Sequence, residues 1–232
     1  MTAAPPVPRI ERHSAVTRLT HWINVAALAL LLMSGLQILN AHPMLYWGEA
    51  GANADPHWLA FPRGLPAWAT IPHYQDLATG RRWHFFAAWV FVVNGAIYLI
   101  VGLIGGHLRR DIVPAKAELA PAHLARDIGN HLRLELPRTA AYNTLQKLAY
   151  LAVVALLLPL MLLTGLTMSP GFNAVAPVLL DLFGGRQSAR SLHFICANLI
   201  VLFTVVHVAM VFAAGAVNAI GAMITGRYRM DP

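Results

Sequence analysis

The chain has 232 residues, of which 57% are hydrophobic and only 12% are charged. Because a soluble domain usually carries about a quarter charged residues, this composition nearly excludes a water-soluble globule. The formal net charge is +7, and in so apolar a chain we interpret the basic excess as a signal of membrane orientation rather than of nucleic-acid binding. With one cysteine, Cys196, and no C-x-x-C-H motif, the chain alone cannot build a disulfide framework, a cysteine-based zinc site, an iron–sulfur cluster or a covalent c-type haem site.

Four apolar stretches are each long enough to cross a bilayer, which takes roughly 20 helical residues. They lack the alternation of a strand, and in hydrocarbon only helices or closed barrels satisfy every backbone polar group. They predict transmembrane helices at about 15–39, 82–106, 143–168 and 188–217, with an outer loop at 40–81 and an inner loop at 107–142. We therefore expect an all-α integral membrane protein, a four-transmembrane-helix bundle that forms a single domain over residues 1–232.

The basic residues predict which way the helices point. If the N-terminus lies inside, twelve of the 17 Lys and Arg residues fall in inner segments and five in outer ones. Since positive charge concentrates in cytoplasmic loops, both termini are expected in the cytoplasm. The outer loop is rich in Pro and Trp, and we interpret it either as an amphipathic segment at the membrane interface or as a docking platform for an extracytoplasmic partner.

Four of the eleven histidines lie in or at the predicted helices. His21 begins the first helix on the inner side, whereas His84 and His193 begin the second and fourth helices on the outer side. His207 follows His193 by fourteen residues, almost four whole turns, so it shares a face of the fourth helix and lies about 21 Å deeper. An ionisable side chain within a span suggests function, although a single one could instead hydrogen-bond a neighbouring helix.

Matching depth groups these histidines into an outer pair, His84 with His193, and an inner pair, His21 with His207. Two imidazoles from different helices that reach one iron axially describe bis-histidine haem b, so the pattern predicts two haems b between the helices. Two such centres stacked across the bilayer form a route for electrons. Glycines in the spans allow the close backbone approach that a porphyrin needs, although glycine is common in membrane helices anyway.

Arginines at the ends of the helices are placed either to contact haem propionates or to anchor the helices at the membrane edge. They are Arg18 on the inner side and Arg81, Arg82 and Arg190 on the outer side. A haem-free metal or proton transporter is the alternative use of histidines within spans. Transport would usually add carboxylates inside the spans, and none of the four predicted spans contains Asp or Glu, so the sequence disfavours it.

The order of the four histidines resembles that of the cytochrome b subunits of respiratory oxidoreductases. The stretches that carry the resemblance are Arg18-Leu19-Thr20-His21-Trp22, Arg82-Trp83-His84, Tyr142-Asn143-Thr144-Leu145-Gln146-Lys147 and Ser191-Leu192-His193 through His207. They cover all four predicted helices. They are similar to the bacterial cytochrome b561 and nickel–iron hydrogenase cytochrome b group, with the gamma subunits of formate dehydrogenases and the cytochrome b subunits of thiosulfate reductases close by.

The resemblance implies a multi-pass, di-haem b electron-transfer subunit of the bacterial inner membrane, embedded in the lipid bilayer and serving a respiratory chain. It implies that quinone or quinol reacts as an exchangeable substrate near the inner haem, around Asn143, Gln146 and Lys147. It also implies a periplasmic molybdopterin-type oxidoreductase, or another soluble redox protein, as partner. Leu145 stands where formate-dehydrogenase relatives typically carry glycine.

A second activity stays open on the same scaffold. The chain could act alone as a cytochrome b561-type oxidoreductase that passes electrons from superoxide to quinone. The long Trp-rich outer loop disfavours this alternative mildly, because it offers more surface than such chemistry requires.

Overall fold

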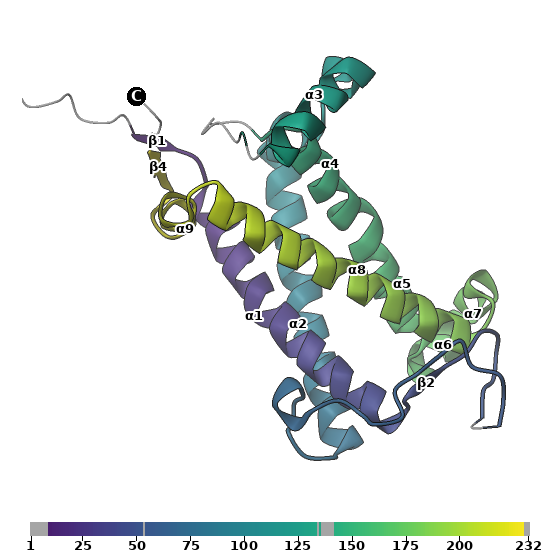
Figure 1. Cartoon of the computed structure of the whole chain (residues 1–232). Helices are drawn as coiled ribbons and strands as arrows, with labels where there is room; N and C mark the ends of the chain where they lie inside the picture. Colours follow the sequence, from purple (N-terminus) through teal and green to yellow (C-terminus); the bar gives the residue numbers. More distant parts are fainter. Residues whose placement is uncertain (1–8, 53, 134, 136–141, 230–232) are drawn as a thin grey trace, which may run out of the picture. The chain divides into compact units, whose positions relative to one another are not determined.

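The structure, a computed structural model, describes residues 9–229 apart from 53, 134 and 136–141. Among these residues four helical segments are long and apolar enough to cross a membrane (Figure 1): α1 (Ala15–Ala41), α2 (Leu77–Ile104), the run from α4 to α5 (Thr144–Thr167) and α8 (Arg186–Ala213). Only 6% to 22% of the residues in their most apolar windows are buried within the chain. Apolar side chains that no protein covers are suited to contact lipid, and the predicted all-α membrane fold with four spans is confirmed.

Polar side chains cap the first turns of three of these spans. The Oγ of Ser14 accepts a hydrogen bond from the backbone N–H of Thr17 at 3.1 Å, ahead of α1. The Oδ1 of Asp76 likewise accepts from a backbone N–H in the first turn of α2, at 3.0 Å. At the start of α4, Asn143 and Gln146 form a reciprocal capping box. Each cap satisfies backbone donors that have no partner inside the helix, so these helices begin where the sequence supplies a cap.

The third span contains a widened turn. α4 (Thr144–Ala152) and α5 (Leu158–Thr167) are joined by the π-helical turn η4 (Val153–Leu157). Pro159 follows this turn, and in a regular α-helix its ring would clash with the carbonyl four residues earlier. A π-helical turn accommodates that conflict without ending the helix.

The fourth span ends earlier than the apolar run in the sequence suggests. α8 stops at Ala213, whereas the run predicts helix to 217. Gly215 adopts a left-handed backbone conformation with φ +103°, which L-residues with side chains rarely adopt. A separate helix, α9 (Ala216–Thr225), begins directly after it.

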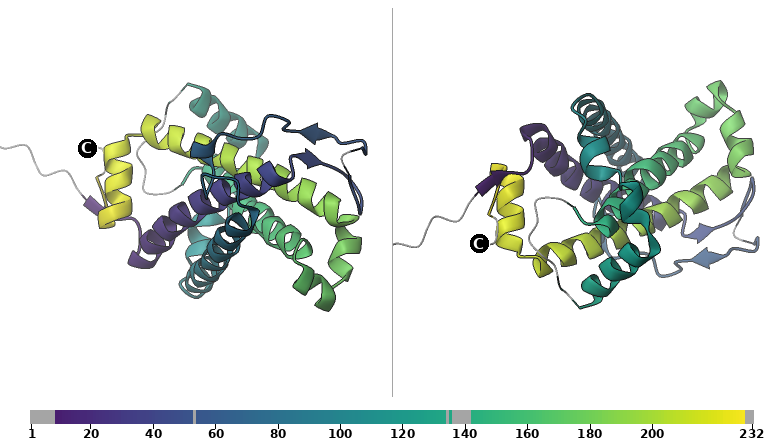
Figure 2. Two further views of the ribbon diagram at one scale, coloured as in Figure 1. Left: turned by 90° about the horizontal axis from the view of Figure 1, so that it is seen from below. Right: turned by 90° about the horizontal axis from the view of Figure 1, so that it is seen from above.

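The chain divides into two compact units, the first comprising Met1–Trp22, Ala96–Val154 and Leu202–Pro232. In it, β1 (Arg9–Glu11) pairs antiparallel with β4 (Arg227–Arg229) beside α9 (Figures 1 and 2). The side chains of Arg18 and Trp22 donate to the carbonyls of Ile224 and Met223, which lie in the last turn of α9 and have no partner within the helix. The other elements of this unit are η2 (Leu108–Ile112), η3 (Lys116–Leu119) and α3 (Pro121–Leu132).

The second unit comprises Ile23–Gly95 and Ala155–Val201. Two short strands, β2 (Met44–Leu45) and β3 (Leu59–Ala60), pair within the 40–81 loop and lie side by side in Figure 2. The loop is bonded to the first turns of α8, because Trp58 Nε1 donates to Ser191 Oγ at 2.9 Å and the Arg190 guanidinium donates to the carbonyls of Met44 and His42. The remaining elements are η1 (Ala67–Ala69), α6 (Pro170–Val175) and α7 (Val178–Phe183).

Candidate functional site

His84 of α2 and His193 of α8 face one another in the second unit. Their ring centroids lie 6.2 Å apart, and the ring planes make an angle of 62°. Nδ1 of His84 lies 3.1 Å from Oγ of Ser34 on α1. Nδ1 of His193 lies 2.9 Å from Oγ1 of Thr164 on α5. Each ring is thus held by a hydroxyl on a third or fourth helix, and Nε2 remains available to bind a metal.

A glycine directly follows each of these hydroxyl residues. A Cβ at Gly35 would lie 3.4 Å from Cε1 of His84, and a Cβ at Gly165 would lie 3.4 Å from Cε1 of His193. A side chain at either position would therefore begin at van der Waals distance from the ring, whereas glycine leaves that space free.

His21 of α1 and His207 of α8 form the second pair, which lies in the first unit. Their ring centroids are 6.5 Å apart at an interplanar angle of 54°. Aromatic side chains surround them: Trp22 meets His21 edge-on at 5.2 Å, and Phe203 stacks on His207 at 5.8 Å. Tyr150 of α4 also meets the ring of His207, at 6.3 Å between centroids. This pair has an apolar, aromatic environment.

The distance between ring centres within each pair fits two imidazoles that bind one metal from opposite sides. A metal–imidazole bond of about 2 Å, extended by about 1 Å from the nitrogen to the ring centre, puts two such ring centres roughly 6 Å apart. The observed separations are 6.2 and 6.5 Å. In the described part of the chain no three or more His, Cys, Asp or Glu side chains gather as a metal-binding group. Each pair therefore offers two protein ligands.

An arginine precedes three of the four histidines by three residues, close to one helical turn: Arg18, Arg81 and Arg190. The Nε of Arg18 is buried and has no hydrogen-bond partner among the described residues, and the same holds for Nδ1 of His21. A buried guanidinium N–H without an acceptor fits an anionic group that the chain itself does not supply. Arg190 is engaged by the carbonyls of the 40–81 loop, Arg81 lies over the ring of Phe85, and Arg82 is exposed.

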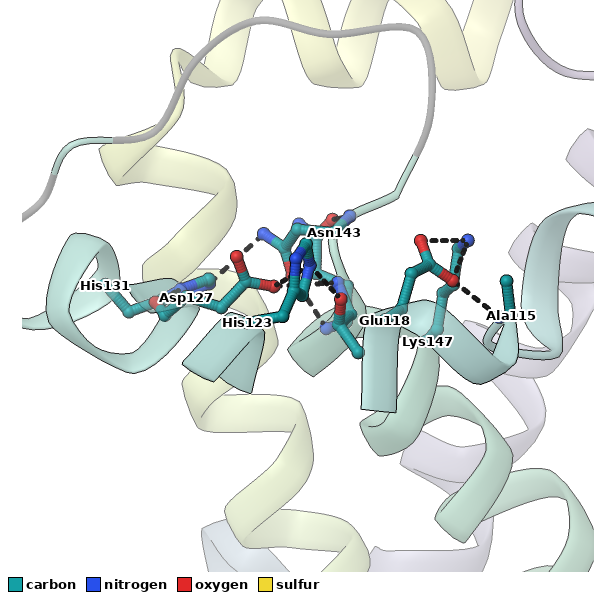
Figure 3. Close-up of polar contacts among 9 residues, drawn as sticks. Ala115, Glu118, His123, Asp127, His131, Asn143 and Lys147 are labelled. Atoms are coloured by element: carbon teal, nitrogen blue, oxygen red, sulfur yellow. Dashed lines mark hydrogen bonds and ion pairs between the residues drawn. The ribbon is translucent and has the colours of Figure 1, made fainter. Parts of the chain in front are cut away.

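Asn143 caps α4, and Gln146 and Lys147 lie in its first turn. α3 packs against this helix, and its side chains reach Asn143 (Figure 3). Oδ1 of Asn143 caps the helix, and its Nδ2 lies 3.3 Å from Nε2 of His131 on α3. The backbone N–H of Thr144 donates to the carboxylate of Asp127 at 3.2 Å. These bonds join α3 to the α4 terminus, where a negative charge is favoured by the helix dipole.

Lys147 is buried beside this cap and paired with Glu118 of η3 (Figure 3). Its Nζ donates to both carboxylate oxygens at 2.9 Å, and the Lys147 side chain is only 10% exposed. The hydrogen bond from Lys147, together with one from the backbone of Ala115, lowers the pKa of Glu118. The carboxylate of Glu118 is therefore ionised at neutral pH.

A cleft of about 250 Å³ opens in the first unit next to this pair. It is lined by Ile10, Glu11, Arg12, Arg110, Asp111, Tyr142 and Lys147. The ring of Tyr142 contacts Tyr150 at 5.3 Å, and Tyr150 in turn contacts His207, so aromatic rings connect the cleft wall to one histidine pair. Burial raises the pKa of Tyr142, which keeps its phenol protonated as a hydrogen-bond donor.

The structure brings together both histidine pairs that depth matching predicts, whereas His107 is engaged by the carboxylate of Asp111 at 2.7 Å. Sequence reasoning missed the residues that surround the site: Ser34, Glu118, Tyr150 and Thr164. For two of them a signal existed, since Ser34-Gly35 and Thr164-Gly165 each put a hydroxyl beside a glycine inside an apolar run. For Glu118 and Tyr150 the sequence offered none.

Comparison with known proteins extends these observations. The family described as prokaryotic cytochrome b561 matches residues 12–226, a range that includes all four paired histidines. The chain is also 33% identical over 199 residues to a putative protein-methionine-sulfoxide reductase subunit, YedZ1, of Azospira oryzae; the alignment covers 86% of this chain and 89% of that protein. No solved structure matches the chain.

Proposed function

The chain belongs to the prokaryotic cytochrome b561 family, and from that premise we propose a di-haem subunit that carries electrons between quinone and a periplasmic redox protein. Membership makes it a multi-pass membrane protein that binds b-type haem and has an electron-transfer role. The number of haems, the quinone and the partner belong to the proposal.

Two haems per chain are supported by the two histidine pairs, the single observation that carries the proposal. His84 and His193 would hold one haem, and His21 and His207 the other, because the ring centres of each pair lie at the separation expected of two imidazoles that share one metal. When bound, each haem supplies a one-electron iron couple. The chain fixes the ligands, and Arg18 offers its buried Nε–H to a propionate. Arg81 and Arg82 remain candidates for the same role, whereas Arg190 is engaged by the 40–81 loop.

Quinone is proposed to react at the cleft beside Lys147. Tyr142 and Lys147 line that cleft, and Tyr150 contacts both Tyr142 and His207, so two aromatic rings would connect a quinone there to one proposed haem ligand. The phenol of Tyr142 can donate a hydrogen bond to a quinone carbonyl, and Lys147, bonded to Glu118, offers a polar group beside it for proton exchange. The side chains of Asn143 and Gln146 shape this wall by capping α4.

The 40–81 loop is proposed as the docking surface for the soluble partner. Trp68 is 81% exposed there, and Tyr74 and Trp47 are also largely exposed. Exposed aromatic side chains are typical anchors of protein interfaces. A molybdopterin-type oxidoreductase in the periplasm fits the proposal, since the similar protein of Azospira oryzae is named as a subunit of a reductase. The proposal sets the chain in the bacterial inner membrane with both termini in the cytoplasm.

Haem quantitation of the purified full-length protein tests the proposal directly. Pyridine haemochrome analysis is expected to give haem b at two per chain, and a quinol analogue is expected to reduce both haems. A stoichiometry of one haem per chain, or two haems that no quinol reduces, would contradict it.

A further inference from the structure

Ser34 and Thr164 make the same set of contacts in two different helices. Each side chain is fully buried, at 0% exposure. Ser34 Oγ lies 2.5 Å from the carbonyl of Leu30, and Thr164 Oγ1 lies 2.6 Å from the carbonyl of Leu160. Each hydroxyl oxygen also lies within hydrogen-bond distance of Nδ1 of a paired histidine.

These contacts determine which nitrogen of each ring carries the proton. A hydroxyl has one proton to donate, and a carbonyl oxygen can only accept, so the protons of Ser34 and Thr164 go to the backbone. Their oxygens must then accept from the histidines, which requires a proton on Nδ1 of His84 and of His193. The ring of His84 also hydrogen-bonds the backbone carbonyl of Leu31, and that of His193 the carbonyl of Met161, so the hydroxyl is one of two acceptors for each ring. The lone pair of each ring is left on Nε2, the nitrogen that would bind iron.

We propose that Ser34 and Thr164 are positioning residues that fix the tautomer of His84 and His193 and strengthen both as electron donors to one haem iron. A hydrogen bond accepted from Nδ1–H makes the imidazole more basic and favours the ferric state, which lowers the reduction potential. The inference rests on the proposed haem ligation by these two histidines. The other pair differs, since in the described part of the chain Nδ1 of His21 is buried and has no hydrogen-bond partner.

The test is a spectroelectrochemical titration of purified, haem-loaded full-length variants. Removing the acceptor in Ser34→Ala or Thr164→Ala is expected to leave two haems per chain and to raise the midpoint potential of one haem only. The ferric–ferrous equilibrium constant should change about threefold to tenfold, or about 30 to 60 mV at 59 mV per tenfold for one electron. The low-spin ferric EPR signal of that haem should shift with it.

Three further variants separate the hydrogen bond from packing. Thr164→Val keeps the shape of the side chain without the hydroxyl and is expected to behave like Thr164→Ala, whereas Thr164→Ser is expected to restore the wild-type potential. Thr167→Ala is the matched control, because Thr167 is equally buried in α5 and bonds the carbonyl of Leu163 but no histidine. If Thr164→Val loses the haem while Thr164→Ser keeps it, the hydroxyl is still identified as the group that holds the ring.

The proposal is overturned if Thr164→Val and Thr164→Ser have the same potential, or if the shift appears in the other haem. His84→Ala distinguishes this failure from failure of the proposed function. If His84→Ala removes one haem while the hydroxyl variants titrate as wild type, only the positioning role is wrong. If His84→Ala retains both haems, the ligand assignment itself is wrong.

Discussion

At the scale of single residues, four imidazoles within apolar helices are the unusual feature of this chain. An ionisable side chain is costly in a membrane span, and here two pairs of them come together at metal-binding separation. Their surroundings differ: hydroxyls and glycines surround His84 and His193, whereas aromatic rings surround His21 and His207. Two haems with distinct reduction potentials are the expected consequence.

Replacement of either member of a pair is expected to remove the same haem. His84→Ala and His193→Ala should each reduce the haem content from two per chain to one, and His21→Ala and His207→Ala should each remove the other haem, because alanine cannot bind iron. Pyridine haemochrome analysis and the reduced-minus-oxidised spectrum measure both losses. His73→Ala, an exposed loop variant, is the control and should retain both haems. Loss of a haem from His107→Ala but not from His21→Ala would contradict the second pairing.

The ion pair between Lys147 and Glu118 predicts a pH dependence of stability. Because the pKa of Glu118 is lowered in the folded protein, the pair stabilises fully above the usual carboxyl pKa of about 4.3 and less as pH falls through the lowered value. Lys147→Met should lose about 1 kcal/mol of stability at pH 7, and the difference from wild type should shrink on acidification. Thermal unfolding of the detergent-solubilised protein between pH 3 and 7 measures this. Lys116 is an exposed neighbour, so the stability difference between Lys116→Met and wild type should not shrink as pH falls.

The pairing of the four histidines can be predicted from the sequence, because the depth of each one follows from its position along its helix. Their neighbours cannot be predicted in this way. Glu118 meets Lys147 across 29 residues and Ser34 meets His84 across 50, so these contacts depend on how helices pack rather than on any local pattern. The spacing of residues along a span thus predicts which histidines can pair, but it does not predict which side chains of other helices hydrogen-bond them.

At the scale of elements, particular residues determine where the long helices begin, widen or end. Apolar runs predict the four spans, while caps set several of their starts. The left-handed Gly215 divides α8 from α9 inside one apolar run, and an apolar run by itself does not reveal that break. The π-helical turn before Pro159 is another feature that hydropathy does not report.

The capping box of α4 gives a prediction at this scale. Asn143→Ala removes the acceptor for the backbone N–H of Gln146 and the donor to His131, so we expect a loss of about 1 kcal/mol or more in unfolding free energy. Asn143→Asp keeps the cap but not the amide donor and should recover most of the loss. Thermal unfolding measures the three stabilities, which should decrease from wild type to Asn143→Asp to Asn143→Ala. If the Ala variant is as stable as wild type, the cap does not hold α4 in place.

At the scale of the whole molecule, the proposed function requires a surface at which a soluble protein can exchange electrons. The 40–81 loop is bonded to the start of α8 through Trp58 and Arg190, only a few residues before His193. A partner bound to this loop would therefore be linked, through these hydrogen bonds, to the segment of α8 that carries one of the proposed haem ligands.

Trp68 is the residue with which to test the docking surface. Trp68→Ala should slow electron exchange with a co-purifying soluble oxidoreductase about tenfold, as expected for loss of an interface anchor, and leave reduction by quinol unchanged. Stopped-flow reduction of each haem measures the two steps separately. Trp89→Ala is the matched control, because Trp89 is also exposed, at 68%, but lies within a membrane span. Equal slowing by both variants would argue against docking at the loop.

The ladder between β1 and β4 has a consequence for how the protein is made. β1 leaves the ribosome before the four described spans, whereas β4 follows them, so the strand partners of Arg9–Glu11 do not exist until these spans have been synthesised. Closure of this ladder therefore requires that all four spans have been synthesised. A polypeptide that stalls before residue 227 would leave the edge of β1 open, and a quality-control protease could recognise that edge.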